Sequence, residues 1–256
     1  MDVDKPTPSS PPPAGESVYV TPLLTIHEPR VVIGDRGAGW LMAGWDNFRA
    51  APGQWLALCI VGTILLVIIN AIPFANFVNG LLQQVWVAGV LLGCHAQFNG
   101  EAIRVRHLFA GFGPKALPLI LSGALVGLAG LLMAAAVFGP LLADMITTPD
   151  PQDFLLQQDM QALLLRVLVL MALMLPLYAA LWFAPALIVF VNLDVKQALK
   201  LSLVGCLKNA WPFLIYGLCA LVLCLLVLLT LGLALLVVVP MFYSSIYVSF
   251  REIYVD

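Results

Sequence analysis

The sequence predicts an all-α fold, a polytopic membrane helix bundle with six spans arranged as three hairpins with interfacial amphipathic helices. Three observations lead to this prediction. Of the 256 residues, 62% are hydrophobic and only 10% are charged, which leaves too little polar surface for a water-soluble domain. The apolar residues gather in long blocks that ionised side chains avoid. The basic residues gather in every second gap between these blocks, as the positive-inside rule expects of cytoplasmic segments.

The first 30 residues lack apolar periodicity and are rich in proline, including the run Thr-Pro-Ser-Ser-Pro-Pro-Pro over residues 7–13. Proline removes backbone hydrogen-bond donors and biases its neighbours towards extended conformations. We therefore expect residues 1–30 to form a disordered cytoplasmic tail, followed by a transmembrane domain over residues 31–256. A docking peptide for a proline-binding domain is the alternative. The first apolar block begins near Gln54, too far along for a cleavable signal peptide, so we expect it to act as an uncleaved insertion signal.

Residues 35–50 predict a short amphipathic helix that lies in the cytoplasmic interface. Leu41, Gly44, Trp45 and Phe48 fall at i, i+3, i+4 and i+7, which places them on one helical face. Tryptophan prefers the headgroup region of a bilayer. We therefore expect Trp40, Trp45 and Phe48 to anchor this helix to the membrane surface.

Six spans follow from the apolar blocks, at about 54–72, 77–95, 117–140, 163–191, 212–230 and 233–250. The last two come from one uncharged stretch, which runs from Trp211 to Phe250. As one helix it would be roughly 60 Å long, against a hydrocarbon core of ~30 Å. We therefore expect a tight turn near Leu231-Gly232. With six spans, both termini and the basic gaps at 96–116 and 192–211 lie in the cytoplasm.

A threefold repeat is visible in the gaps that precede the first, third and fifth spans. Each gap contains an amphipathic stretch, then a base, then a proline near the start of the span. Residues 195–210 show the amphipathic part well. The repeating unit would be an interfacial helix followed by a membrane hairpin. The bases and prolines are Arg49 and Pro52, Lys115 and Pro118, and Lys208 and Pro212.

Several short motifs outside the tail carry a resemblance to a known family. They are Arg36-Gly37-x-x-Trp40-Leu41-x-x-Gly44-Trp45-x-x-Phe48, Asn99-Gly100-Glu101, Leu108-Phe109-Ala110-Gly111-Phe112, Phe183-Ala184-Pro185-Ala186-Leu187, Lys208-Asn209-x-x-Pro212-Phe213 and Ser244-Ser245-x-Tyr247-x-x-Phe250-Arg251-Glu252-Ile253. With them the chain resembles, over about 35–256, an uncharacterised family of proteobacterial six-span inner-membrane proteins. The resemblance implies a multi-pass protein of the bacterial inner (plasma) membrane. The chain is also similar in outline to the membrane-anchor domain of some glycerophosphodiester phosphodiesterases, but it has no room for the phosphodiesterase domain.

The expected second span has the most polar interior, with Asn79, Gln83 and Gln84. Asn79 and Gln83 are four residues apart and share a helical face, so these side chains are a candidate polar path. The alternative is hydrogen bonding to neighbouring helices. Pro176 and Pro185 interrupt the expected fourth span, and each is expected to kink it. Broken helices line binding sites in transporters, but kinks also serve packing.

No sequence feature indicates an enzyme. No acidic or basic residue lies near a span centre, and Walker, GxSxG, HExxH and CxxC motifs are absent. The five cysteines lack disulfide spacing, and no metal or cofactor is expected. The net charge of −2 does not favour nucleic acid as a partner. The expected partner is the lipid bilayer, with a homo-oligomer or another membrane protein left open.

We interpret the chain as a non-enzymatic membrane protein with a structural, adaptor or lipid-handling role in the cell envelope. The alternative is a small transporter or channel that uses the second span and the kinked fourth span.

Overall fold

The computed structural model describes residues 24–72, 75–147 and 159–255, and all regular structure in these residues is helical. In chain order the helices are α1 (Arg36–Ala50), α2 (Pro52–Asn70), α3 (Ala75–Phe98), the 3-10 helix η1 (Val105–Phe112), α4 (Ala116–Thr147), α6 (Met160–Trp182), α7 (Ala184–Phe190), α8 (Val195–Lys208), α9 (Ala210–Leu229) and α10 (Leu235–Tyr254). The predicted all-α class is confirmed.

Five of the described helical segments are long and apolar enough to cross a membrane: α2, α4, α6 taken together with α7, α9 and α10. A membrane helix bundle is thereby confirmed. The predicted second span, α3, is not among the five. Its 24 residues would still extend about 36 Å, more than the ~30 Å of a hydrocarbon core. The count of six spans therefore stays a prediction.

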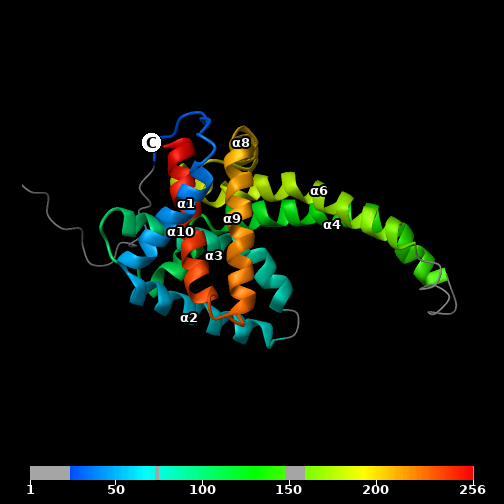
Figure 1. Ribbon diagram of the computed structural model, residues 1–256, viewed down its shortest axis with the longest axis horizontal. Coiled ribbons are helices and arrows are strands. Elements are labelled where there is room, and N and C mark those ends of the chain that lie inside the picture. The colour runs from blue at the N-terminus through cyan, green and yellow to red at the C-terminus, as the bar shows by residue number, and fades with distance from the viewer. Residues whose placement is uncertain (1–23, 73–74, 148–158, 256) are drawn as a thin grey trace, which may run out of the picture.

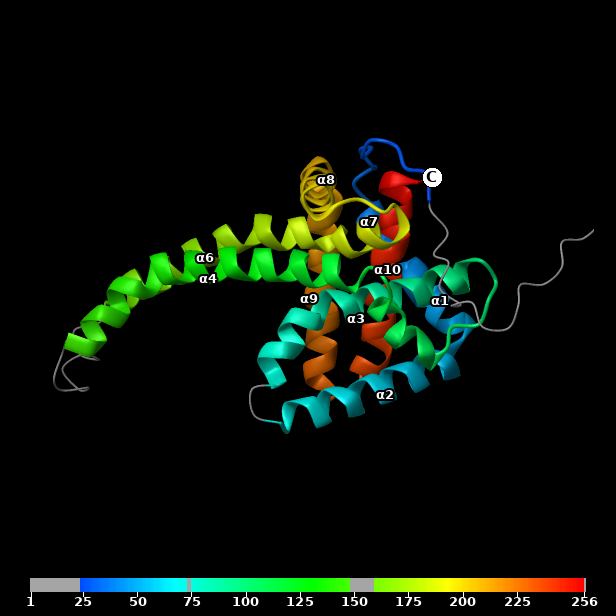
Figure 2. The same cartoon turned by 180° about the vertical axis from the view of Figure 1, so that it is seen from behind.

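The long helices follow one another as three pairs, α2 with α3, α4 with α6, and α9 with α10, and a short helix precedes each pair. These short helices are α1, η1 and α8, which is the repeating unit that the sequence suggested. Figures 1 and 2 show α4 and α6 side by side, projecting from the rest of the molecule as a long arm. α9 and α10 run crosswise to this arm (Figure 1). The hairpins are therefore not parallel, an arrangement that the sequence pattern did not indicate.

The turn between α9 and α10 confirms the predicted reversal near Leu231-Gly232. α9 ends at Leu229 and α10 begins at Leu235. Leu231 and Gly232 both have positive φ, of 52° and 89°, a region that glycine enters without steric strain. The Gly232 N–H donates to the Val227 carbonyl at 2.8 Å, which caps the end of α9.

The predicted fourth span is divided at Phe183 into α6 and α7. Pro185 lies in the first turn of α7, where proline is accepted, whereas Pro176 lies inside α6 without ending it. A side chain from α8 bonds the backbone at the break. The Phe183 N–H donates to Ser202 Oγ at 2.9 Å, and Ser202 Oγ donates to the Ala179 carbonyl at 2.7 Å. Neighbouring helices satisfy the backbone of broken membrane helices in this way.

Helix α1 approaches α9 and α10 closely because glycine stands at the two points of contact. A Cβ atom on Gly37 would lie 2.0 Å from the Pro212 carbonyl oxygen, and one on Gly44 would lie 2.3 Å from the Met241 carbonyl oxygen. Both distances are far below van der Waals contact, so any side chain at either position would push the helices apart. This buried face of α1 is directed at the protein.

The three predicted membrane anchors on α1 have different surroundings. The exposed fractions of Trp40 and Phe48 are 0% and 7%, and both belong to the hydrophobic core. Only Trp45 turns its ring outward, with 39% exposed, stacked on Phe48. Among the three, Trp45 alone can reach lipid headgroups in this structure, and its role as an anchor stays a prediction.

Residues 24–35 form an extended strap across the ends of α7 and α10. The Leu24 N–H donates to the last carbonyl of α7 at 2.7 Å, and the His27 N–H donates to the last carbonyl of α10 at 2.9 Å. The Arg30 N–H also donates to the Ile253 carbonyl at 3.1 Å, so residues 24–30 contact the helix bundle, and the disorder of the tail stays a prediction. The rest of that prediction, residues 1–23, lies outside the described residues.

Candidate functional site

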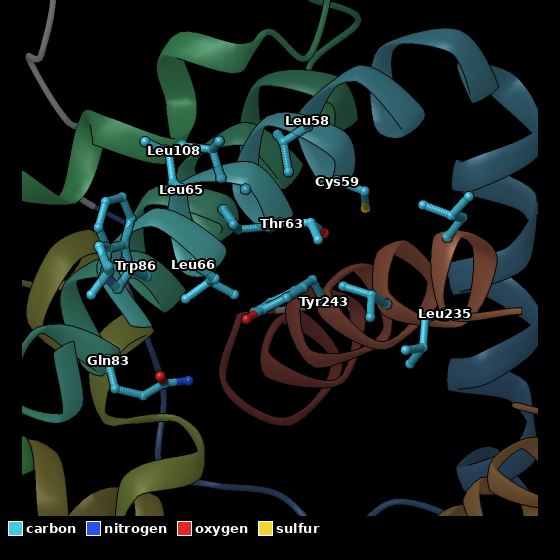
Figure 3. Close-up of a pocket in the computed structure, with 15 residues that line it drawn as sticks. Leu58, Cys59, Thr63, Leu65, Leu66, Gln83, Trp86, Leu108, Leu235 and Tyr243 are labelled. Atoms are coloured by element: carbon cyan, nitrogen blue, oxygen red, sulfur yellow. The ribbon is translucent and has the colours of Figure 1, made fainter. Parts of the chain in front are cut away.

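A cavity of about 400 Å³ lies between α2, α3, α10 and η1 (Figure 3). This volume is within the range of small-molecule pockets. Helices α2 and α10 contribute mostly leucine, isoleucine and valine side chains to its walls. Helix α3 contributes Gln83, Trp86 and Val90, and η1 contributes Leu108. The walls thus come from the first and the last hairpin, which are far apart in the sequence.

The wall formed by η1 is held against α3 by a glycine on each element. A Cβ atom on Gly111 would lie 2.0 Å from the Val85 carbonyl oxygen, and one on Gly89 would lie 2.6 Å from the His107 carbonyl oxygen. The two backbones therefore touch, which only glycine allows. This contact fixes η1 so that Leu108, the residue after His107, reaches the cavity.

Three side chains with hydroxyl or amide groups line the cavity: Thr63 from α2, Gln83 from α3 and Tyr243 from α10. Figure 3 shows the Gln83 amide and the Tyr243 hydroxyl pointing toward one another from opposite sides of the cavity. Thr63 and Gln83 are exposed and Tyr243 is half-buried, and within the described part of the chain none of the three side chains makes a hydrogen bond. The cavity is therefore apolar over most of its wall, with a few unpaired donors.

The Trp86 ring completes this part of the wall. It packs edge-on against Phe109 and Phe112, with ring centroids 5.8 and 4.9 Å apart. Its indole Nε1 is buried and has no hydrogen-bond partner among the described residues. Two aromatic contacts of this kind hold the ring in one orientation. Trp86 therefore forms part of the cavity wall together with these two rings.

The rim of the cavity is apolar and faces outward. Leu66 of α2 has 44% of its surface exposed, and Leu235 of α10 has 47% exposed. Both residues line the cavity, on helices that are long and apolar enough to cross a membrane. In a bilayer the rim would meet acyl chains rather than water.

Beyond the cavity, two polar side chains of α3 hold it against α10, α2 and α1. The Asn99 amide donates to His95 Nε2 at 3.0 Å, so the neutral His95 ring carries its proton on Nδ1 and donates to the Tyr247 hydroxyl at 2.6 Å. Gln97 accepts from Trp55 Nε1 at 3.0 Å and donates to a carbonyl of α1 at 2.6 Å. These bonds fix the helices that form the cavity walls.

Sequence reasoning did not assign these roles. His95 and Gln97 lie in the last turn of α3, and no role was predicted for them. Tyr243 and Tyr247 were not singled out as a pair. A usable signal was present, because Tyr243 and Tyr247 are four residues apart and therefore share one face of α10.

The residues of the predicted polar path, Asn79, Gln83 and Gln84, do not all face the same cavity. Gln83 lines the cavity, whereas Gln84 is 8% exposed and its side chain lies against α4, 3.2 Å from the Cβ position of Gly123. Adjacent residues on a helix project about 100° apart. The oxygen atoms of Asn79 and Gln84 are buried without a partner among the described residues. Asn79, Gln84 and Pro185 are not among the residues that line the cavity.

The described residues contain no group of three or more His, Cys, Asp or Glu side chains that could hold a metal ion. All five cysteines are free thiols. No family model, curated protein or solved structure matches the chain. The site therefore has to be interpreted from its own geometry.

Proposed function

We propose that the protein is a non-enzymatic integral protein of the bacterial inner membrane that binds a membrane lipid, with an acyl chain in the cavity between α2, α3 and α10. One observation carries the proposal: a largely apolar, uncharged cavity of about 400 Å³ on helices suited to a bilayer. Its rim at Leu66 and Leu235 faces outward. An acyl chain would enter sideways from the bilayer without crossing water.

A transporter or channel for a polar solute has less support. Such a path would need a continuous polar lining, and the side chains suggested for it do not surround one void. Gln83 faces the cavity, Gln84 faces α4, and Pro185 lies at a break that Ser202 closes. Binding of an acyl chain needs only the largely apolar cavity that is present.

The proposal includes six spans with both termini in the cytoplasm, α3 being the additional span. The basic gaps along the sequence support this orientation. The resemblance to the uncharacterised family of proteobacterial inner-membrane proteins supports the location. The length of α3 and its pairing with α2 in a hairpin support the count.

The test fills the cavity with a side chain. Around the Cβ position of Gly62, a residue that lines the cavity, the nearest heavy atom is Leu108 Cδ2 at 3.9 Å. A leucine at position 62 therefore fits and occupies the space meant for an acyl chain. Gly127 on α4 is the matched control, because nothing lies within 4 Å of its Cβ position. Both variants would be extracted in mild detergent and examined for bound lipid by native mass spectrometry.

We expect Gly62→Leu to retain several-fold less lipid than the wild type, and Gly127→Leu to retain the same amount. Near-equal melting temperatures of the two variants would show that both are folded. Equal lipid retention by wild type and Gly62→Leu would refute the proposed site. Uptake of a polar solute by reconstituted vesicles, abolished by Gly62→Leu, would favour the transporter instead.

A further inference from the structure

We infer that the cavity recognises the ester region of a glycerolipid rather than its headgroup, an inference that rests on the lipid-binding function proposed above. Thr63, Gln83 and Tyr243 carry it. They come from three different helices and line one cavity. Each has a hydrogen-bond donor, and none has a partner within the residues that the structure describes.

Unpaired donors in apolar surroundings are unfavourable, and a bilayer offers no water to pair them. Thr63 and Gln83 are exposed, so where acyl chains cover them, an acceptor on the ligand would satisfy their donors. A carbonyl oxygen has two lone pairs, so it can accept from both an amide and a hydroxyl. The Gln83 amide and the Tyr243 hydroxyl, which point toward one another in Figure 3, are placed for such a shared acceptor.

The absence of charge decides which lipid group enters. No Lys, Arg, His, Asp or Glu is among the residues that line this cavity. A phosphate in such a place would be an uncompensated buried charge, which is strongly unfavourable. The ester carbonyls are uncharged, and they connect the acyl chains to the headgroup. Binding through them leaves the headgroup outside the cavity, so headgroup chemistry should have little influence on binding.

The experiment compares two lipids that differ only at this acceptor. Purified protein would be offered equal amounts of dipalmitoyl phosphatidylglycerol and its dihexadecyl ether analogue, with native mass spectrometry as the readout. One ordinary hydrogen bond corresponds to roughly a three- to tenfold change in binding. We expect the wild type to prefer the diester by about this factor. Dipalmitoyl phosphatidylethanolamine should compete equally with the phosphatidylglycerol.

Two variants remove the donors without changing the size of the cavity much, Gln83→Leu and Tyr243→Phe. In the double variant the diester and the ether should bind equally, with total lipid close to the wild-type amount. Tyr178→Phe is the matched control, because Tyr178 is 64% exposed on α6, away from the cavity. It should keep the preference.

Each result has a defined meaning. Equal binding of diester and ether by the wild type would overturn the inference, while leaving the lipid site in place if Gly62→Leu still removes the lipid. A preference between headgroups larger than the preference for ester would also overturn it. Failure of both glycerolipids to bind would refute the proposed function together with the inference.

Discussion

Replacing Glu252 should destabilise the protein more than removing its ion-pair partner. Glu252 Oε1 accepts from Arg36 Nε and Oε2 accepts from Trp40 Nε1, both at 2.6 Å. Its main-chain carbonyl also accepts from Arg30 Nε at 2.6 Å. The carboxylate therefore joins α1 to α10, beside the strap. Its hydrogen bond and charge raise the pKa of Arg36 above the ordinary value, the direction expected of a paired guanidinium.

The two bonds of this carboxylate differ in burial. Trp40 is fully buried, so removing its acceptor leaves an unpaired N–H, which costs about 1–3 kcal/mol beyond the loss of a charged hydrogen bond. The Arg36 side chain is 49% exposed, and such an ion pair contributes at most about 1 kcal/mol. We therefore expect Glu252→Ala to cost about 2–4 kcal/mol and Arg36→Met to cost about 1 kcal/mol or less.

Thermal unfolding in mild detergent would measure both effects. At roughly 2–4 °C per kcal/mol for a chain of this size, Glu252→Ala should lower Tm by about 5–15 °C. Glu28→Ala, an exposed acidic residue of the strap, is the control and should change little. In a Trp40→Phe background the cost of Glu252→Ala should fall, because the orphaned N–H is gone. Equal losses from Arg36→Met and Glu252→Ala would refute the assignment of most of the energy to Trp40.

Three further outcomes are expected. Burial, the largest cause, lowers the pKa of His107 from 6.5; its contribution to stability is therefore present above pH 6.5 and is lost as pH falls below it. The melting temperature of His107→Asn should therefore fall less than that of the wild type between about pH 7.5 and about pH 5.5. Equal falls in melting temperature would argue against a stabilising role of the neutral His107 ring. Gly44→Ala should lower the free energy of unfolding by about 1–3 kcal/mol, because its Cβ would overpack against Met241. Gly53→Ala should leave it unchanged, because nothing lies within 4 Å of the Gly53 Cβ position. Chemical denaturation of both variants would measure the difference. An alkaline phosphatase fusion truncated at Gly232 should be active and one at the C-terminus inactive; the reverse pattern would leave five spans.

The features that the sequence predicted well are those set by local composition. The turn at Gly232 followed from the length of an uncharged block and from a glycine in it. Helix α8 followed from its apolar period, and Pro185 marked the division of the fourth span within two residues of the break at Phe183. In each case the deciding information lies within one turn of the residue concerned.

The features that the sequence did not predict depend on which helices meet. The apolar face of α1 was recognised, but periodicity cannot tell whether a face meets lipid or another helix, so Trp40 and Phe48 were expected at headgroups and lie in the core. The contacts of the strap, residues 24–35, also could not be predicted from the sequence. Its prolines do predict an extended backbone, yet the hydrogen bonds that hold residues 24–30 come from α7 and α10.

The cavity is the strongest example of this limit. Gln83 was singled out for its polarity inside a predicted span, and that signal was informative. Its counterparts were not recognised, because Thr63 and Tyr243 are separated from it by 20 and 160 positions in the numbering. A polar residue in a span indicates that a partner is required, but only the arrangement of helices identifies the partner. Here the three side chains line one cavity without bonding to one another. Under the proposed function, the acceptor for these donors is an ester carbonyl of a lipid from the bilayer around the rim.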